Sequence, residues 1–188
     1  MNKKISLLAL LSIISTSVYA EEISQYQDEA RAVAMPFLKQ LGAANKNAVS
    51  EGGPVSAVTV CKDIAPQMSG DISRKTGWKL TRVSLKVRNP LLGTADAWEQ
   101  KVLQDFDVRA AKGEKPETIE TSEIVQEANG KFYRYMKAIA MQPGCVACHG
   151  SEISDAVKAS LSAEYPHDRA TGYSAGQIRG AVSIKRAL

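Results

Sequence analysis

The 188-residue sequence predicts an α+β domain, in which N-terminal helices precede a mainly antiparallel sheet with one helix inserted after its first strand. Up to Gly70, apolar residues recur every three or four positions, which is typical of helices. After Gly77 they alternate with polar residues, which is typical of half-buried strands. Asn129-Gly130 separates two such strands and favours a tight antiparallel hairpin.

Residues 1–20 have the layout of a secretory signal peptide. Met1–Lys4 is positively charged, Ile5–Ile14 is apolar, and Val18-Tyr19-Ala20 places small residues where a signal peptidase cleaves. The apolar run is shorter than the roughly 20 residues that span a membrane comfortably, and no later segment approaches that length. We therefore expect export to the periplasm and one soluble domain over residues 21–188, with no membrane span after cleavage. A buried N-terminal helix and an uncleaved anchor are the alternatives.

Two helices are predicted before the sheet. The first covers Glu21–Val49, in which Pro36 should introduce a kink or a break. Asn45–Pro54 contains two adjacent glycines and should form a turn. Pro54 suits the first position of a second helix that carries Cys61 on its apolar face and ends near Gly70.

The later elements follow from changes of period and from turn residues. They are expected to form an antiparallel sheet with one inserted helix and one short helix before the last strand. In order, we expect a strand over Trp78–Val87 that Asn89-Pro90 ends, a helix over Ala95–Lys112, strands over Thr118–Ala128 and Lys131–Met141 joined by a type I′ turn, a helix over Glu152–Leu161, a loop over Asp168–Gly176 and a strand over Ile178–Arg186.

Composition and charge exclude several classes of protein. Hydrophobic residues make up 44% of the chain and charged residues 23%, so it is not disordered. A net charge of +4 is too small to indicate nucleic-acid binding. Three cysteines are too few for a disulfide-dense scaffold, and two histidines exclude any site that needs three.

Cys145-Val146-Ala147-Cys148-His149 is the C-x-x-C-H sequence that attaches a c-type haem. Each thiol forms a thioether with one vinyl group, and the spacing lets both reach one edge of the porphyrin. The histidine that follows is then placed beneath the iron as the proximal ligand. Export agrees with this prediction, because bacteria attach c-type haem outside the cytoplasm.

Three other uses of this motif are weaker. A thioredoxin-type C-x-x-C opens a helix after a buried parallel strand, whereas the pattern here is antiparallel. A structural zinc site needs four tetrahedral ligands, and the adjacent Cys148 and His149 would not serve one metal together with Cys145. A disulfide between Cys145 and Cys148 would close a strained small ring.

Haem attachment leaves Cys61 as an unpaired thiol in an oxidising compartment. It is either the distal iron ligand or a small buried apolar residue, and its position alone does not separate these. Methionine is the usual distal ligand of electron-transfer cytochromes. The other candidates are Met68, Met136, Met141, His167 and an open site.

Several stretches together resemble a known family. They are Val60–Pro66, Arg82–Pro90 followed by Ala97-Trp98-Glu99, Cys145–Gly150, Tyr165–Tyr173 and Ile178–Ile184, which occur in the family's order over nearly the whole mature chain. The family comprises extracytoplasmic c-type haem domains with a PAS-like fold, long catalogued as domain of unknown function 3365 and also called the Tll-type haem domain. Val83 and Leu91-Leu92 depart from its pattern.

The resemblance implies one covalently bound haem c against a PAS-like, mainly antiparallel sheet with N-terminal helices. Carried over residue by residue, it implies His149 as the proximal iron ligand and Cys61 as the distal one. The departures at Val83 and Leu91-Leu92 do not involve either of these ligand positions.

The two haem propionates need cations or hydrogen-bond donors. Arg82, Arg88, Arg179 and Tyr173 are the candidates, because arginine pairs with carboxylates through two hydrogen bonds. For each of them a structural ion pair or a solvated side chain is the alternative. For Arg88 and Asp168 the alternative is that they hold a loop in place.

We expect a periplasmic monohaem c-type protein that senses redox state or a gas ligand such as CO or NO. It would report to a separate redox or signalling protein, because the chain carries no kinase, cyclase or DNA-binding segment. The alternative is a small electron-transfer cytochrome c with His/Met ligation. An enzyme such as a peroxidase needs a distal acid–base residue, for which only His167 is available, so we expect no enzymatic activity.

Overall fold

The computed structural model describes the backbone of residues 6–188 and the side chains from residue 21 onward. The predicted signal peptide falls partly on residues 1–5, outside the described residues, and partly on residues 6–20, of which only helical backbone is described. Its cleavage therefore stays a prediction. Among the helices whose side chains are described, none combines the length and apolar character of a membrane span.

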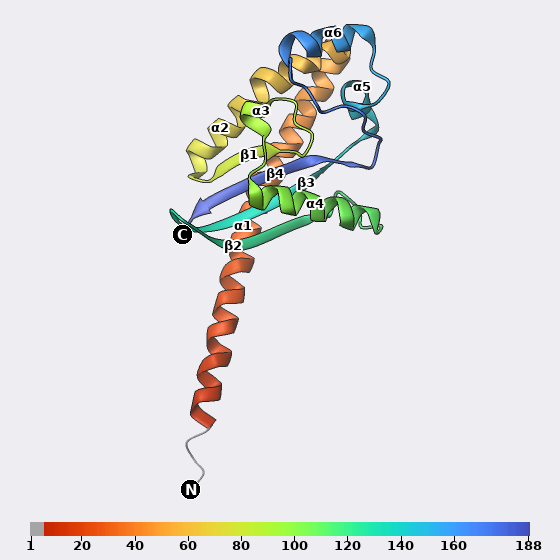
Figure 1. Cartoon of the computed structure of the whole chain (residues 1–188). Helices are drawn as coiled ribbons and strands as arrows, with labels where there is room; N and C mark the ends of the chain where they lie inside the picture. The colour runs from red at the N-terminus through yellow and green to blue at the C-terminus, as the bar shows by residue number, and fades with distance from the viewer. Residues whose placement is uncertain (1–5) are drawn as a thin grey trace.

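The N-terminal half of the chain forms a helical hairpin against the sheet (Figure 1). α1 spans Ser6–Thr59, but Gly52 and Gly53 have non-helical backbone angles, and Gly53 takes a positive φ of 73°. A five-residue π-helix, η1 (Val60–Ile64), follows, and α2 (Ala65–Thr76) continues from it. The two glycines reverse the chain, so that the end of α1 and η1 lie back along its earlier turns.

Four strands form one fully antiparallel sheet in the order β1-β4-β3-β2. Their bounds are β1 Lys79–Val83, β2 Glu120–Glu127, β3 Gly130–Ala140 and β4 Ile178–Ala187. The helical hairpin covers one face, and α4 (Ala97–Ala111) covers the other (Figure 1). The predicted α+β class, with N-terminal helices and an antiparallel sheet, is confirmed.

Successive side chains of each strand point to opposite faces of the sheet, so the apolar ones form two separate cores. On the helical side, Leu80, Tyr133 and Val182 pack against buried residues of α1 such as Phe37. On the other side, Val83, Met136 and Ala181 pack under α4. Arg82 has the same parity as Leu80, so it belongs to the face that the helical hairpin covers.

The helix boundaries differ from the prediction in several places. The turn expected over Asn45–Pro54 is confined to Gly52 and Gly53, and the helix expected over Glu152–Leu161 spans Asp155–Glu164. Pro36 does not break α1, because only Gly52 and Gly53 depart from helical angles. Pro36 is exposed, and the buried stripe on both sides of it holds the helix on the sheet. The second helix also runs past Gly70 to Thr76, where Gly77 ends it with a φ of 75°.

The first strand and the hairpin also differ. β1 ends at Val83 rather than Val87, because the Ser84 amide donates to the Gly93 carbonyl and the Ser84 hydroxyl accepts from the Lys86 amide in place of ladder pairing. In the hairpin Glu127 pairs with Gly130, so Ala128 and Asn129 are the two central residues of the turn. A type I′ turn needs a positive φ at both of them, but no non-glycine residue of the described chain has a positive φ. The predicted type I′ turn is therefore wrong, although the hairpin itself is confirmed.

Replacing Phe37 by alanine should destabilise the domain by about 3–5 kcal/mol, because its fully buried ring anchors α1 to the sheet. Urea unfolding followed by circular dichroism measures this. Leu91→Ala, at a side chain that is 94% exposed, is the control and should stay within about 0.5 kcal/mol of wild type. A loss below about 1 kcal/mol for Phe37→Ala would show that α1 does not depend on this contact.

Candidate functional site

The C-x-x-C-H residues lie just beyond the end of β3. Pro143–Cys145 form a 3₁₀ turn, η2, and Val146–His149 form a one-turn helix, α5. Gly150 closes this helix with a bond from its amide to the Val146 carbonyl, and a Cβ at that position would lie only 2.6 Å from the same oxygen. Both thiols are free, so the structure contains no disulfide between Cys145 and Cys148.

His149 is held as a neutral, oriented imidazole. Its Nδ1 lies 2.7 Å from the Ala170 carbonyl oxygen. Burial lowers the pKa of His149 to about 2, and the nearby charges of Arg179 and Arg88 contribute in the same direction. With the Nδ1 proton donated to Ala170, the Nε2 lone pair is available to a metal.

Arg88 fixes the loop that carries Ala170. Its buried guanidinium donates from Nε to Asp168 Oδ2 at 3.0 Å and from Nη2 to the Cys148 carbonyl at 2.6 Å. Asp168 Oδ1 in turn accepts from the Ala170 amide at 2.7 Å. Two roles were predicted for Arg88, binding a haem propionate and holding the loop in place. These contacts favour the second role.

Cys61 lies in η1, in the same neighbourhood as the α5 cysteines. Its half-buried Sγ is 3.8 Å from Asn45 Oδ1 across the hairpin of α1. Burial raises the pKa of both Cys148 and Tyr165, and the charge of Cys61 adds a smaller effect in the same direction on each of them. Cys61, Cys148 and Tyr165 are therefore close together. The π-helix that presents Cys61 was not predicted, and such segments are frequent at functional sites.

The other predicted distal ligands lie in varied surroundings. Met136 is fully buried under α4, on the opposite face of the sheet from the helical hairpin. Met141 is also buried, next to the loop that precedes β4. Met68 packs from α2 against the helical-side core, and His167 is exposed in a turn.

The remaining predicted cofactor-binding residues give the site an excess of positive charge. Arg82 is half-buried, and its guanidinium makes no hydrogen bond or ion pair with any residue that the structure describes. Its charge adds a small effect to the burial that lowers the pKa of His149. Arg179 donates to Ser84 and to the Lys86 carbonyl, and its Nε lies 3.2 Å from His149 Nδ1. The Tyr173 ring stands edge-on to His149 at 6.5 Å. Asp168 pairs with Arg88 and its charge also acts on Arg179, whereas Arg82 has no carboxylate within ion-pair distance among the described residues.

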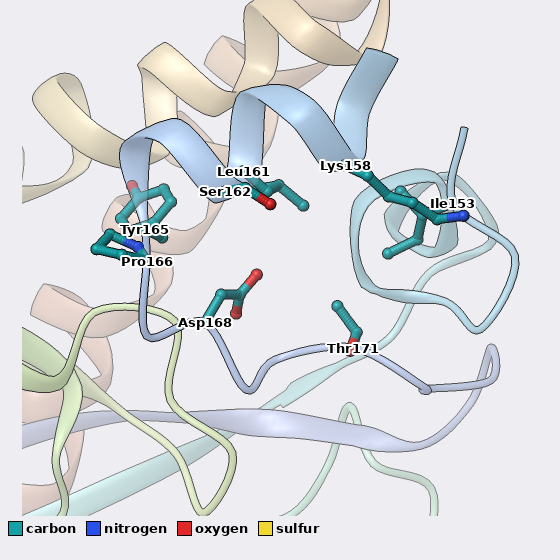
Figure 2. A pocket seen from close by; sticks show the side chains of 8 residues that line it. All are labelled: Ile153, Lys158, Leu161, Ser162, Tyr165, Pro166, Asp168 and Thr171. Carbon is teal, nitrogen blue, oxygen red and sulfur yellow. The ribbon is translucent and has the colours of Figure 1, made fainter. Parts of the chain in front are cut away.

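A cavity of about 350 Å³ opens beneath α6 (Asp155–Glu164), as Figure 2 shows. The Asp168 carboxylate points into it from the loop below. Its apolar wall includes Ile153, Leu161 and Tyr165, which also form the buried cluster against which Cys148 packs. The second attachment cysteine therefore lies beside an apolar surface that a large ring could cover.

Replacing Asp168 by alanine should cost about 3–5 kcal/mol of stability, because it leaves the buried Arg88 charge without its partner. Chemical unfolding of the purified protein measures this. The matched control is Glu164→Ala, which breaks the more exposed pair with Lys62 and should cost at most about 1 kcal/mol. Equal effects of the two substitutions would contradict the role of the buried pair.

Comparison with known proteins agrees with the predicted resemblance. The family model described as Tll0287-like, Tll0287, matches residues 14–186. Among solved structures, the chain is similar to the crystal structure of the cyanobacterial haem protein Tll0287, with 23% identity and a TM-score of 0.61 over 82% of this chain and 92% of that one. At this identity the likeness shows the fold. No curated protein matches the sequence. Because the family match spans nearly the whole chain, the protein belongs to the Tll0287-like family.

Proposed function

We propose that this chain is a periplasmic haem protein that carries one covalent haem c on Cys145 and Cys148. The observation that carries the proposal is the geometry of α5, where two free thiols precede a neutral histidine whose Nδ1 is fixed by the Ala170 carbonyl. The solved relative is itself described as a haem protein, which supports the same assignment.

The residues present fit this group. Cys148 lies against an apolar cluster on which the edge of a porphyrin can pack. Arg82 supplies a guanidinium without any partner among the described residues, which suits a propionate. Tyr173 and Arg179 lie at His149 itself, so we assign them to its positioning rather than to a propionate.

We propose Cys61 as the second axial ligand. It shares a neighbourhood with Cys148, whereas Met136 lies on the far face of the sheet. When bound, a haem supplies an iron that changes oxidation state and binds diatomic gases. A thiolate from Cys61 would stabilise the ferric state, and protonation of this thiolate would release it.

This arrangement suits a sensor of redox state or of a gas such as CO or NO. η1 joins the end of α1 to α2, so a change in the bonding of Cys61 would act on the helical hairpin. A signal would pass from this hairpin to a separate protein. A His/Met electron carrier is the alternative, for which Met68 on α2 is a candidate ligand on the helical side of the sheet. We propose no enzymatic activity.

Covalent attachment is tested by expressing the full chain with a bacterial haem-maturation system. The wild-type protein should keep its pigment after denaturation and acid-acetone extraction and should gain the mass of one haem. Cys145→Ala and Cys148→Ala should each remove one thioether bond, and the double variant should lose all covalent pigment. Cys61→Ala should keep it. Wild-type protein that releases its pigment on extraction would falsify the assignment.

The axial ligand is tested by absorption and paramagnetic resonance of the ferric protein. Cys61→Ala should convert a low-spin thiolate spectrum into one with a changed sixth ligand or an open position. Met68→Ala should leave the spectrum unchanged. The opposite pattern would establish His/Met ligation, and identical high-spin spectra in all three proteins would exclude Cys61 as a ligand.

A further inference from the structure

Asn45 is a polar residue on the apolar stripe that α1 turns toward the core. The stripe is formed by Ala30, Ala34, Phe37, Leu41 and the partly buried Ala48. Asn45 follows Leu41 by four positions and precedes Ala48 by three, so it lies on the same face of the helix. Its side chain is half-buried there. An amide among apolar side chains costs free energy unless it is hydrogen-bonded, so this position requires a partner.

The partner of Asn45 is Cys61. The Cys61 Sγ lies 3.8 Å from Asn45 Oδ1, and this is the one hydrogen bond that the Asn45 side chain makes with any residue of the described range. A thiol is a weak donor, and a net hydrogen bond of this kind adds little to stability. An apolar side chain of the same size would therefore serve the core equally well. The packing of α1 does not account for an asparagine at this position.

The fold holds Cys61 opposite Asn45. Val60 and Ala65 are both buried, and the Ala65 amide donates to the Val60 carbonyl to close the π-turn between them. Lys62 also forms an ion pair with Glu164, which ties η1 to α6. The Cys61 sulfur is thus fixed from both sides of its own residue, and its contact with Asn45 follows from the architecture of the helical hairpin.

The Asn45 amide can serve two forms of the sulfur. Its oxygen accepts a hydrogen bond and its NH₂ group donates two. In the structure the thiol donates to the oxygen. A cysteine sulfur that ligates a metal is a thiolate and has no proton to donate. Since no second hydrogen bond to the described residues holds the amide, a half-turn about its last side-chain bond brings Nδ2 into the place of Oδ1, where it donates to the sulfur.

We propose that Asn45 is a positioning residue for the second axial ligand, and that its amide donates a hydrogen bond to the Cys61 thiolate and raises the reduction potential of the haem. This inference rests on the proposed function. A hydrogen bond draws negative charge from the sulfur and weakens its donation to the metal. The ferric state is then favoured less strongly than an unmodified thiolate would favour it.

The reduction potential of the matured full-length protein tests this role, measured by spectroelectrochemical titration. Asn45→Leu, which is similar in size, should raise the ferric-to-ferrous ratio at a given potential about tenfold, which lowers the reduction potential by about 59 mV for one electron. Asn45→Ala should give the same direction of shift. Asn45→Asp replaces the donor by a negative charge and should lower the potential at least as far as Asn45→Leu.

Asn47→Leu is the matched control, since Asn47 is an exposed asparagine of the same helix, and it should keep the wild-type potential. Urea unfolding separates the proposed role from a structural one. Asn45→Leu should have the wild-type urea midpoint or a higher one, because an apolar side chain suits the stripe. A wild-type potential in Asn45→Leu and Asn45→Ala would overturn the proposal, and so would an equal shift in Asn47→Leu.

The Cys61→Ala background shows whether Asn45 acts through the sulfur. Adding Asn45→Leu to Cys61→Ala should leave the potential of Cys61→Ala unchanged, because the acceptor is gone. A further shift of about tenfold in this background would overturn the proposal.

Failure of the proposed ligation gives a different result. If Cys61→Ala has the wild-type absorption and paramagnetic resonance spectra, Cys61 is not an axial ligand, and the role of Asn45 is excluded with it. If Cys61→Ala changes these spectra while Asn45→Leu keeps the wild-type potential, the ligation by Cys61 stands and only the inference about Asn45 fails.

Discussion

The buried ion pair between Arg88 and Asp168 holds the functional part of this molecule together. Neither partner is near the other in sequence, and both are removed from water. Such a pair is costly to bury unless its remaining hydrogen-bonding capacity is used. Here part of it is used, because Arg88 also donates to the Cys148 carbonyl and Asp168 accepts from the Ala170 amide. One interaction thus ties the attachment helix, the loop after α6 and the segment after β1 to one another.

The ion pair between Arg88 and Asp168 also affects His149, through the loop residue Ala170. The carbonyl of Ala170 can orient the imidazole only if its loop is rigid, and the Asp168 contact with its amide supplies that rigidity. Burial then keeps the imidazole neutral, which is the protonation state a metal requires. The histidine is therefore prepared for ligation by Arg88, Asp168 and Ala170, which lie outside the C-x-x-C-H motif.

The sheet divides the molecule into two sides with different chemistry. The helical hairpin with Cys61 covers one face, and α4 covers the other. Arg179 comes from the central strand β4 and contacts both Ser84, just after β1, and His149. The sheet thus helps to position the histidine of the attachment motif.

The sequence was enough to predict the α+β class, the antiparallel hairpin and the C-x-x-C-H motif, because hydrophobic period, turn residues and motif spacing are local properties. It could not predict that Pro36 leaves α1 unbroken, that Ser84 ends the first strand or that Cys61 lies in a π-helix. Each of these depends on what packs against or bonds to the residue from elsewhere in the chain.

The sequence by itself therefore determined which residues carry the chemistry: two thiols and a histidine at fixed spacing, a third cysteine and a surplus of arginine. Only the tertiary structure decided which role each of these residues has. It paired Arg88 with Asp168, left Arg82 without a partner among the described residues and set Arg179 against His149. The physical reason is that a charge acts through its neighbours in space, and these neighbours come from segments that only folding brings together.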